Sequence, residues 1–138
     1  IILALGNGFF TPNKLEIIGG DHINVSYRVS KNYHDYDNKD VIILGGGDSA
    51  VDFANEIKTK STANVTIIHR RDVFRANGEN VKKLEKNSIK IILNANLEKI
   101  EEDTLYFEDK KINQKLKVHF DNIIVQYGQK INTSLPNA

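Results

Sequence analysis

The stretch Val41-Ile42-Ile43-Leu44-Gly45-Gly46-Gly47-Asp48-Ser49-Ala50 decides how this chain folds. Its four leading apolar residues have the length of a β-strand that is covered on both faces. From Asp48 onward, apolar residues recur at helical spacing to about Lys60. The glycines between the two patterns break both of them. We therefore predict a strand, a tight turn and a helix over residues 41–60.

Further elements follow on the C-terminal side. Apolar, β-branched runs predict strands over residues 65–68, 89–93 and 123–125, and helical spacing predicts a helix over residues 77–87. Between residues 97 and 120 the apolar residues are spaced as in short strands with one solvated face. Such strands are typical of an antiparallel meander. The order of elements predicts an α/β fold with a small parallel sheet.

The glycine turn has the form G-x-G-x-x-A between a strand and a helix, which is typical of a dinucleotide-binding site. Gly45 permits the tight turn, Gly47 lets the backbone approach a pyrophosphate, and Ala50 permits close contact between helix and strand. Free N–H groups at the helix start favour an anion there. Gly45, Gly47, Ser49 and Ala50 are predicted to hold the pyrophosphate, and the predicted cofactor-binding residues of the turn are Gly45, Gly46, Gly47, Asp48, Ser49 and Ala50.

These observations together predict a Rossmann-like, three-layer NAD(P)-binding domain. Helices would cover one face of the parallel sheet, and a three-stranded antiparallel meander would cover the other. Two residues of the turn have alternative interpretations. Asp48 can be a helix-start residue stabilised by the helix dipole. Ser49 can cap the helix instead of binding phosphate, and its backbone N–H is the favoured ligand over its hydroxyl.

A cluster of arginines follows the second strand. NAD-binding domains place an acidic residue there to hold the ribose 2′-hydroxyl, whereas this chain has His69-Arg70-Arg71 and then Arg75. Guanidinium groups match phosphate oxygens. We therefore predict that Arg70, Arg71 and Arg75 bind a 2′-phosphate, so that the cofactor is NADP(H). His69 would stack on the adenosine or hydrogen-bond to it. The alternatives are a solvated loop with incidental charge and a histidine that only ends the strand.

Composition limits the other possible functions. A chain of 138 residues, 40% hydrophobic and 27% charged, is typical of one globular domain. No apolar run reaches the ~18 residues of a membrane span, and the net charge of +1 indicates no nucleic-acid partner. Cysteine is absent, which excludes disulfides and thiolate catalysis within these residues and favours a cytoplasmic location. Because residues 1–5 read as a buried strand that begins without Met, we expect the chain to be part of a longer polypeptide.

Residues 45–54, followed by His69-Arg70-Arg71-Asp72-Val73-Phe74-Arg75-Ala76, resemble the NADPH domain of thioredoxin-reductase-like flavoproteins. Residues 27–37 contain no cysteine, whereas thioredoxin reductases have a redox C-x-x-C in the corresponding stretch. The chain therefore looks more like the ferredoxin (flavodoxin)–NADP reductases of this type. In that family, NADPH passes a hydride to FAD, and the flavin passes electrons to ferredoxin or flavodoxin. The family is homodimeric, and its NADPH domain can rotate relative to the FAD domain.

The resemblance implies three segments. Residues 1–15 would be the end of the FAD domain and a crossing strand, residues 16–125 the NADPH-binding domain, and residues 126–138 the return crossing. Gln126, Tyr127 and Gly128 would then lie near the nicotinamide. FAD would bind only to other parts of the full-length protein, because one dinucleotide turn is present.

No side chain is assigned a catalytic role, because the hydride passes between cofactors. The histidines outside the arginine cluster lack metal-ligand spacing, so no metal site is predicted. Two other functions stay open. The chain could be the NADPH domain of a disulfide reductase whose cysteines lie elsewhere, or a non-catalytic NADP-binding module.

Overall fold

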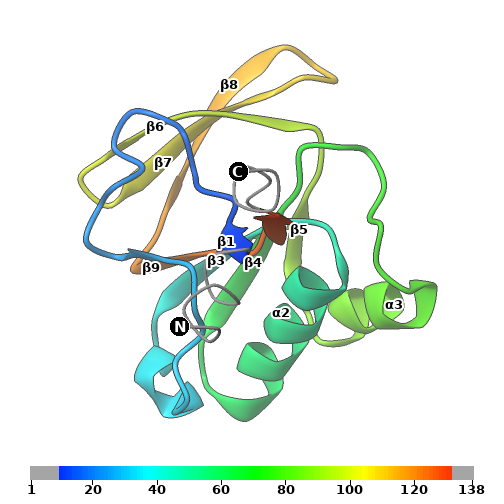
Figure 1. The fold of residues 1–138 in the computed structure, drawn as a ribbon. Helices are drawn as coiled ribbons and strands as arrows, with labels where there is room; N and C mark the ends of the chain where they lie inside the picture. Colours follow the sequence, from blue (N-terminus) through cyan, green and yellow to red (C-terminus); the bar gives the residue numbers. More distant parts are fainter. Residues whose placement is uncertain (1–9, 132–138) are drawn as a thin grey trace, which may run out of the picture.

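The computed structural model describes residues 10–131, which fold into three layers (Figure 1). A five-stranded parallel sheet forms the middle layer, with strand order β2-β9-β3-β4-β5. Two α-helices cover one of its faces, and a three-stranded antiparallel meander covers the other. The predicted α/β, Rossmann-like three-layer architecture is therefore confirmed.

Four of the five strands of the parallel sheet have their predicted bounds to within one or two residues. The short strand β2 was not predicted, because two residues are too few to show a periodic pattern. The five strands are β2 (Val25–Ser26), β3 (Asp40–Leu44), β4 (Asn64–Ile68), β5 (Lys90–Ile92) and β9 (Asn122–Val125).

The helices α2 (Asp48–Lys60) and α3 (Gly78–Lys86) begin in different ways. The Asn77 side chain caps α3 by accepting a hydrogen bond from the Glu79 N–H, at 2.9 Å. The residue at the N-cap of α2 is Gly47, which provides no side-chain cap. The first N–H groups of α2 therefore have no side-chain acceptor from the cap position. A short 3₁₀ helix, Tyr33–Tyr36, precedes β3.

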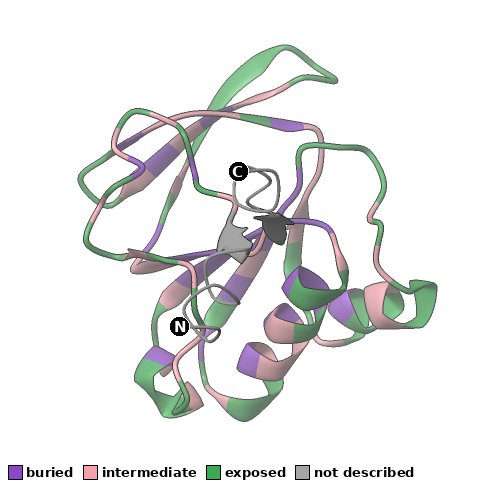
Figure 2. Cartoon of the chain, viewed as in Figure 1, coloured by how far each residue is buried: buried purple, intermediate pink, exposed green. Residues whose placement is uncertain are grey.

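The alternation of side chains along β3 divides the core into two clusters. Val41 and Ile43 pack on the helix side, whereas Ile42 and Leu44 pack on the meander side. Figure 2 shows the resulting buried band running through the sheet and along the inner face of α2. Both faces of the sheet are therefore covered, as expected for parallel strands.

The meander consists of β6 (Ala95–Glu101), β7 (Thr104–Asp109) and β8 (Gln114–His119). Leu105 and Phe107 on β7 are buried against the sheet, as the spacing predicted. Leu116 on β8 is 40% exposed, whereas Val118 on the same strand packs against the buried cluster. Strand β8 lies at the edge of its own sheet, so alternation there does not ensure that the apolar side is covered.

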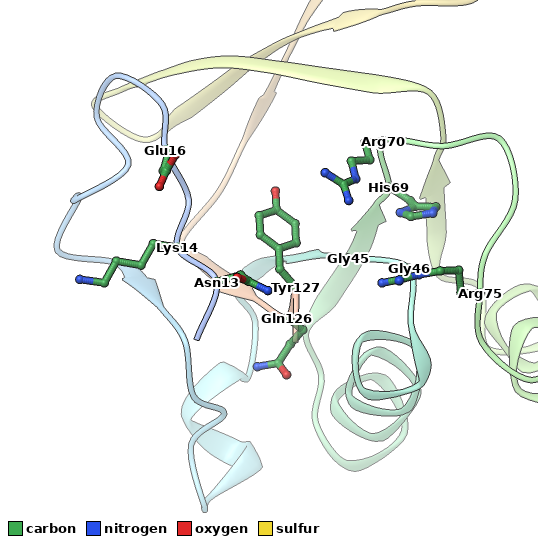
Figure 3. Close-up of a pocket in the computed structure, with 10 residues that line it drawn as sticks. All are labelled: Asn13, Lys14, Glu16, Gly45, Gly46, His69, Arg70, Arg75, Gln126 and Tyr127. Carbon is green, nitrogen blue, oxygen red and sulfur yellow. The ribbon is translucent and has the colours of Figure 1, made fainter. Parts of the chain in front are cut away.

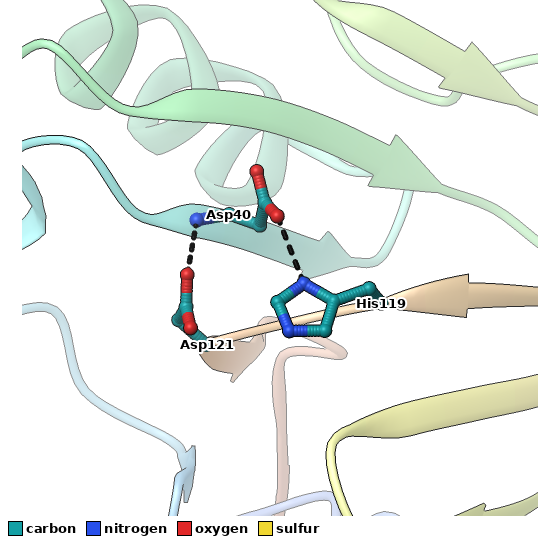
Figure 4. A group of neighbouring side chains, drawn as sticks. All are labelled: Asp40, His119 and Asp121. Atoms are coloured by element: carbon teal, nitrogen blue, oxygen red, sulfur yellow. Dashed lines mark hydrogen bonds and ion pairs between the residues drawn. The ribbon is translucent and has the colours of Figure 1, made fainter.

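An ion-pair cluster joins the meander to the start of β3 (Figure 4). His119 Nδ1 lies 2.8 Å from Asp40 Oδ2, and His119 Nε2 lies 3.2 Å from Asp103 Oδ2. The Asp40 N–H donates to Asp121 Oδ2 at 2.8 Å. The hydrogen bond to Asp40 and the nearby carboxylates raise the pKa of His119. Because both ring nitrogens contact carboxylates, the cluster is explained as a structural ion-pair network.

The two ends of the described chain lie side by side. Strand β1 (Phe10–Pro12) pairs antiparallel with β10 (Gln129–Ile131). The strand predicted over residues 1–5 lies outside the described residues. Within residues 10–131, neither helix has the length and apolar character needed to cross a membrane.

Candidate functional site

The glycine turn joins the carboxyl ends of three neighbouring strands. The Gly45 N–H donates to the Ile68 carbonyl at 3.0 Å, and the Gln126 N–H donates to the Leu44 carbonyl at 2.8 Å. Gly45 has a φ of +142°, and a Cβ at this position would lie 2.3 Å from the Gln126 carbonyl oxygen. Only glycine fits there. The turn is therefore fixed by both neighbours of β3.

The other two glycines of the turn have different surroundings. A Cβ on Gly46 would lie 2.3–2.5 Å from three atoms of the His69 imidazole, so this ring packs directly on the Gly46 backbone. A Cβ on Gly47 would meet only Arg75 Nη2, at 3.9 Å. The backbone of Gly47 is thus open to a ligand, with an arginine head group close by.

A pocket of about 390 Å³ opens over the turn (Figure 3). His69, Arg70 and Arg75 form one side, which we call the arginine wall. Tyr127 stands between this wall and the opposite one. The complete lining is Asn13, Lys14, Glu16, Gly45, Gly46, His69, Arg70, Arg75, Gln126 and Tyr127.

His69 is the buried polar group of this pocket. Its side chain is only 5% exposed and stacks on Phe74, with ring centroids 5.6 Å apart. Burial and the neighbouring Arg75 and Arg70 lower the pKa of His69, which favours the neutral ring near pH 7. Its Nε2 has no hydrogen-bond partner among the described residues. A buried nitrogen without a partner costs free energy until a ligand or water supplies one.

Seven of the predicted site residues line this one pocket. They are Gly45, Gly46, His69, Arg70, Arg75, Gln126 and Tyr127. The others lie at its margin or beyond it. Gly47, Ser49 and Ala50 lie at the start of α2, next to the lining glycines. Arg71 and Gly128 are exposed and do not line the pocket.

The side chain of Asp48 makes a hydrogen bond within the protein. Its Oδ1 accepts a hydrogen bond from the Asn77 N–H at 2.9 Å, which joins the start of α2 to the start of α3. This contact agrees with the alternative that Asp48 is a structural residue. Its role as a cofactor-binding residue, like the ligand roles of the other site residues, stays a prediction.

The opposite wall was not predicted from the sequence. It consists of Asn13, Lys14 and Glu16, which come from the segment after β1. The Asn13 N–H donates to the Gly128 carbonyl at 3.1 Å, and the Leu15 N–H donates to the Tyr27 hydroxyl at 2.9 Å. No motif marks these residues, because tertiary contacts alone bring them to the pocket.

The fold and the glycine turn place the chain in the class of Rossmann-type dinucleotide-binding domains. Residues 1–135 match the family described as pyridine nucleotide-disulphide oxidoreductase. The chain belongs to this family of oxidoreductases. The predicted resemblance to thioredoxin-reductase-like flavoproteins of the ferredoxin–NADP reductase type is confirmed.

Curated relatives support the same relationship. The chain is 41% identical to a ferredoxin–NADP reductase of Malacoplasma penetrans, over 99% of this chain and 45% of that protein. It is 40% identical to a ferredoxin–NADP reductase of Streptococcus suis, over 94% of this chain and 42% of that protein. The chain thus spans less than half the length of these relatives.

Solved structures show the same fold. A thioredoxin reductase of Lactococcus lactis has a TM-score of 0.77 and 27% identity, with 88% of this chain and 43% of that chain covered. A bacillithiol disulfide reductase of Staphylococcus aureus has a TM-score of 0.80 and 27% identity, with coverage of 94% and 40%.

Proposed function

We propose that this chain is the NADP(H)-binding domain of a flavin-dependent oxidoreductase. In the longer protein, NADPH would pass a hydride to FAD, and the flavin would pass electrons to ferredoxin or flavodoxin. The observation that carries the cofactor proposal is that Arg70 and Arg75 line one pocket with Gly45 and Gly46, at the uncapped start of α2. This combination provides cationic and backbone donors for phosphate groups.

The residues of the pocket fit a dinucleotide with a 2′-phosphate. The pyrophosphate would lie on Gly45 and Gly47, at a helix start that has no side-chain cap. Arg70, Arg71 and Arg75 would bind the 2′-phosphate, with His69 beside the adenosine; of the three arginines, Arg70 and Arg75 line the pocket. Gln126 and Tyr127 would then face the nicotinamide half. When bound, the nicotinamide supplies the hydride; the side chains of this chain bind and orient it.

The preference for NADP over NAD should be large. A hydrogen bond to a charged group contributes about 1.5–3 kcal/mol. Two arginine contacts to a 2′-phosphate would therefore favour NADP by roughly 10²–10⁴-fold, with solvent exposure pulling toward the lower value.

Other features of the whole protein are proposed from the relatives. FAD would bind outside this chain, and residues 1–15 and 126–138 would form the crossings to its domain. The antiparallel pairing of β1 with β10 supports two crossings that run side by side. We also propose a cytoplasmic homodimer, as the resemblance implies.

A second candidate function is disulfide reduction, because the solved relatives include thioredoxin and bacillithiol disulfide reductases. This chain has no cysteine, so the redox cysteines would have to lie elsewhere in the protein. Reduction of a disulfide substrate by the full-length protein, without reduction of ferredoxin or flavodoxin, would favour this candidate.

Calorimetric titration of the chain with NADP and with NAD tests the cofactor proposal directly. We expect NADP to bind at least about 100-fold more tightly than NAD, as the arginine contacts imply. Equal affinity for the two cofactors, or no binding of either, would contradict the proposal. For the full-length protein, bleaching of a flavin absorbance band by NADPH tests the hydride transfer.

A further inference from the structure

The loop that carries the arginines is attached to the glycine turn at both of its ends. We define the arginine loop as residues 70–77, between β4 and α3. At its start, the His69 ring packs on the Gly46 backbone. At its end, the Gly46 carbonyl accepts hydrogen bonds from the Arg75 N–H at 2.8 Å and from the Ala76 N–H at 3.2 Å. The next residue, Asn77, donates its N–H to Asp48.

The proposed function, on which this inference rests, explains why these contacts between the arginine loop and the glycine turn matter for binding. A 2′-phosphate and a pyrophosphate lie at a fixed separation in NADP, so their two binding elements must be held at a matching separation. We infer that Gly46 and Asp48 are positioning residues that set NADP selectivity by holding the arginine loop against the pyrophosphate turn. Neither side chain needs to touch the 2′-phosphate.

Gly46 occupies the position of the G-x-G-x-x-A pattern that is ordinarily free to vary. Here it cannot vary without cost, because any side chain would collide with the imidazole of His69. That imidazole is buried and stacked on Phe74, so it cannot move aside as a flexible surface chain would. The absence of a side chain at Gly46 therefore lets the arginine loop approach the turn.

Asp48 has a charge of the wrong sign for a phosphate ligand. A carboxylate at the start of α2 stabilises the helix but repels an incoming pyrophosphate. Its hydrogen bond to the Asn77 N–H explains why an acid is nevertheless useful at this position. Two effects of removing Asp48 consequently have opposite signs: loss of charge strengthens binding of every anion, whereas loss of the contact weakens NADP selectively.

Two substitutions separate these effects. Asp48→Asn keeps an oxygen that accepts from the Asn77 N–H, and Asp48→Ala removes it. We expect Asp48→Ala to weaken NADP binding by about 5- to 30-fold, which is less than the full effect of losing a hydrogen bond to a charged group because the site is exposed. NAD binding should change by less than about threefold or become tighter. Asp48→Asn should retain the NADP preference of the unmodified chain.

The matched control is Asp52→Ala, which removes an exposed carboxylate one turn further along α2. It should leave the ratio of NADP to NAD affinity unchanged. Calorimetry with NADP, NAD and adenosine 2′,5′-bisphosphate measures the selectivity, and hydrogen exchange at the Asn77 amide reports whether the contact has opened. If Asp48→Ala does not fold, Asn77→Pro tests the same contact by removing the donating N–H at a φ of −54°, which proline accepts, with the same selective loss expected.

The outcomes distinguish this inference from the proposed function. If the unmodified chain shows no preference for NADP, the proposed function fails. If it prefers NADP but Asp48→Ala keeps that preference, or weakens NADP and NAD equally, only the positioning role is overturned. A selective loss of NADP together with faster exchange at Asn77 would support it.

Discussion

The two walls of the pocket differ in how they are built. The arginine wall follows β4 directly and is held by backbone hydrogen bonds from Arg75 and Ala76 to Gly46. The opposite wall lies far away in sequence and is held at Asn13 and Leu15, each by one hydrogen bond. The first wall has two cations, whereas the second has one cation, Lys14, and one anion, Glu16. Because the arginine wall is charged and attached to the glycine turn, we expect it to set the proposed preference for NADP, whereas the other wall would mainly enclose the ligand.

The largest expected effect comes from removing the charge of the arginine wall. Replacing Arg70 and Arg75 together by Ala should weaken NADP binding by about 10²-fold or more, because both phosphate contacts are lost. NAD should be affected by less than about threefold. Calorimetric titration measures both affinities.

Arg71→Ala tests the third predicted ligand of the 2′-phosphate. Arg71 is exposed like Arg70 and Arg75 but does not line the pocket, so Arg71→Ala should weaken NADP binding by less than the double variant does. A loss as large as that of the double variant would show that the arginine loop rearranges on binding. Equal losses of NADP and NAD in the double variant would mean that the arginines stabilise the fold instead.

Gly45→Ala should disturb the structure of both walls, since Gly45 lines the pocket between them. The new Cβ would collide with the Gln126 carbonyl, and the φ of +142° is unfavourable for alanine. We expect a loss of roughly 2–3 kcal/mol in the free energy of unfolding and weaker binding of NADP and NAD alike. Chemical denaturation and calorimetry measure the two effects. A variant as stable as the unmodified chain would refute the close packing at this turn.

On the opposite wall, Lys14→Ala should have a smaller and unselective effect. Because Lys14 is exposed and lies near Glu16, its loss should weaken NADP and NAD by the same factor, about two- to fivefold. The effect should disappear at high salt, since exposed charges are screened. A selective loss of NADP would place the 2′-phosphate on this wall and reverse the comparison.

The smallest expected effect is a change in the titration of His69. Its pKa is lowered from 6.5 by burial and by the arginines, so its NMR titration should have a midpoint below that of an ordinary histidine. NADP should raise this midpoint more than NAD does, because a nearby phosphate favours the charged ring. Equal shifts with both cofactors would argue against a 2′-phosphate near His69.

The same shift has a consequence for stability. The unfolded chain takes up a proton at His69 first as the pH falls, because the folded pKa is the lower of the two. The contribution of His69 to the free energy of unfolding is therefore present above pH 6.5 and is lost as the pH falls through the folded pKa. His119 behaves oppositely: its raised pKa gives a contribution that is present below pH 6.5 and is lost as the pH rises through the folded value.

The contrast between the two walls also indicates which parts of the fold and of the pocket could be predicted from the sequence. The strand, turn and helix around Gly45 were predictable, because periodicity and glycine positions are local signals, and α2 ends at Lys60 as expected. The arginine wall was predictable because it lies next to β4 in sequence. Asn13 and Lys14 gave no signal, since only long-range hydrogen bonds bring them to the pocket. The contact of Asp48 with Asn77 likewise depends on how two helices are placed.

The parallel pairing of β3 with β9 affects the order in which the pocket can form. Asp40 and Asp121, at the beginnings of this strand pair, are hydrogen-bonded across a sequence separation of 81 residues. Such a contact closes a long loop, and its entropy is lost before the contact gives any stabilisation. During synthesis, the glycine turn emerges early but lacks its neighbour Gln126 until β9 has also emerged. The proposed cofactor would therefore stabilise a nearly complete domain more than a nascent chain that stops before β9.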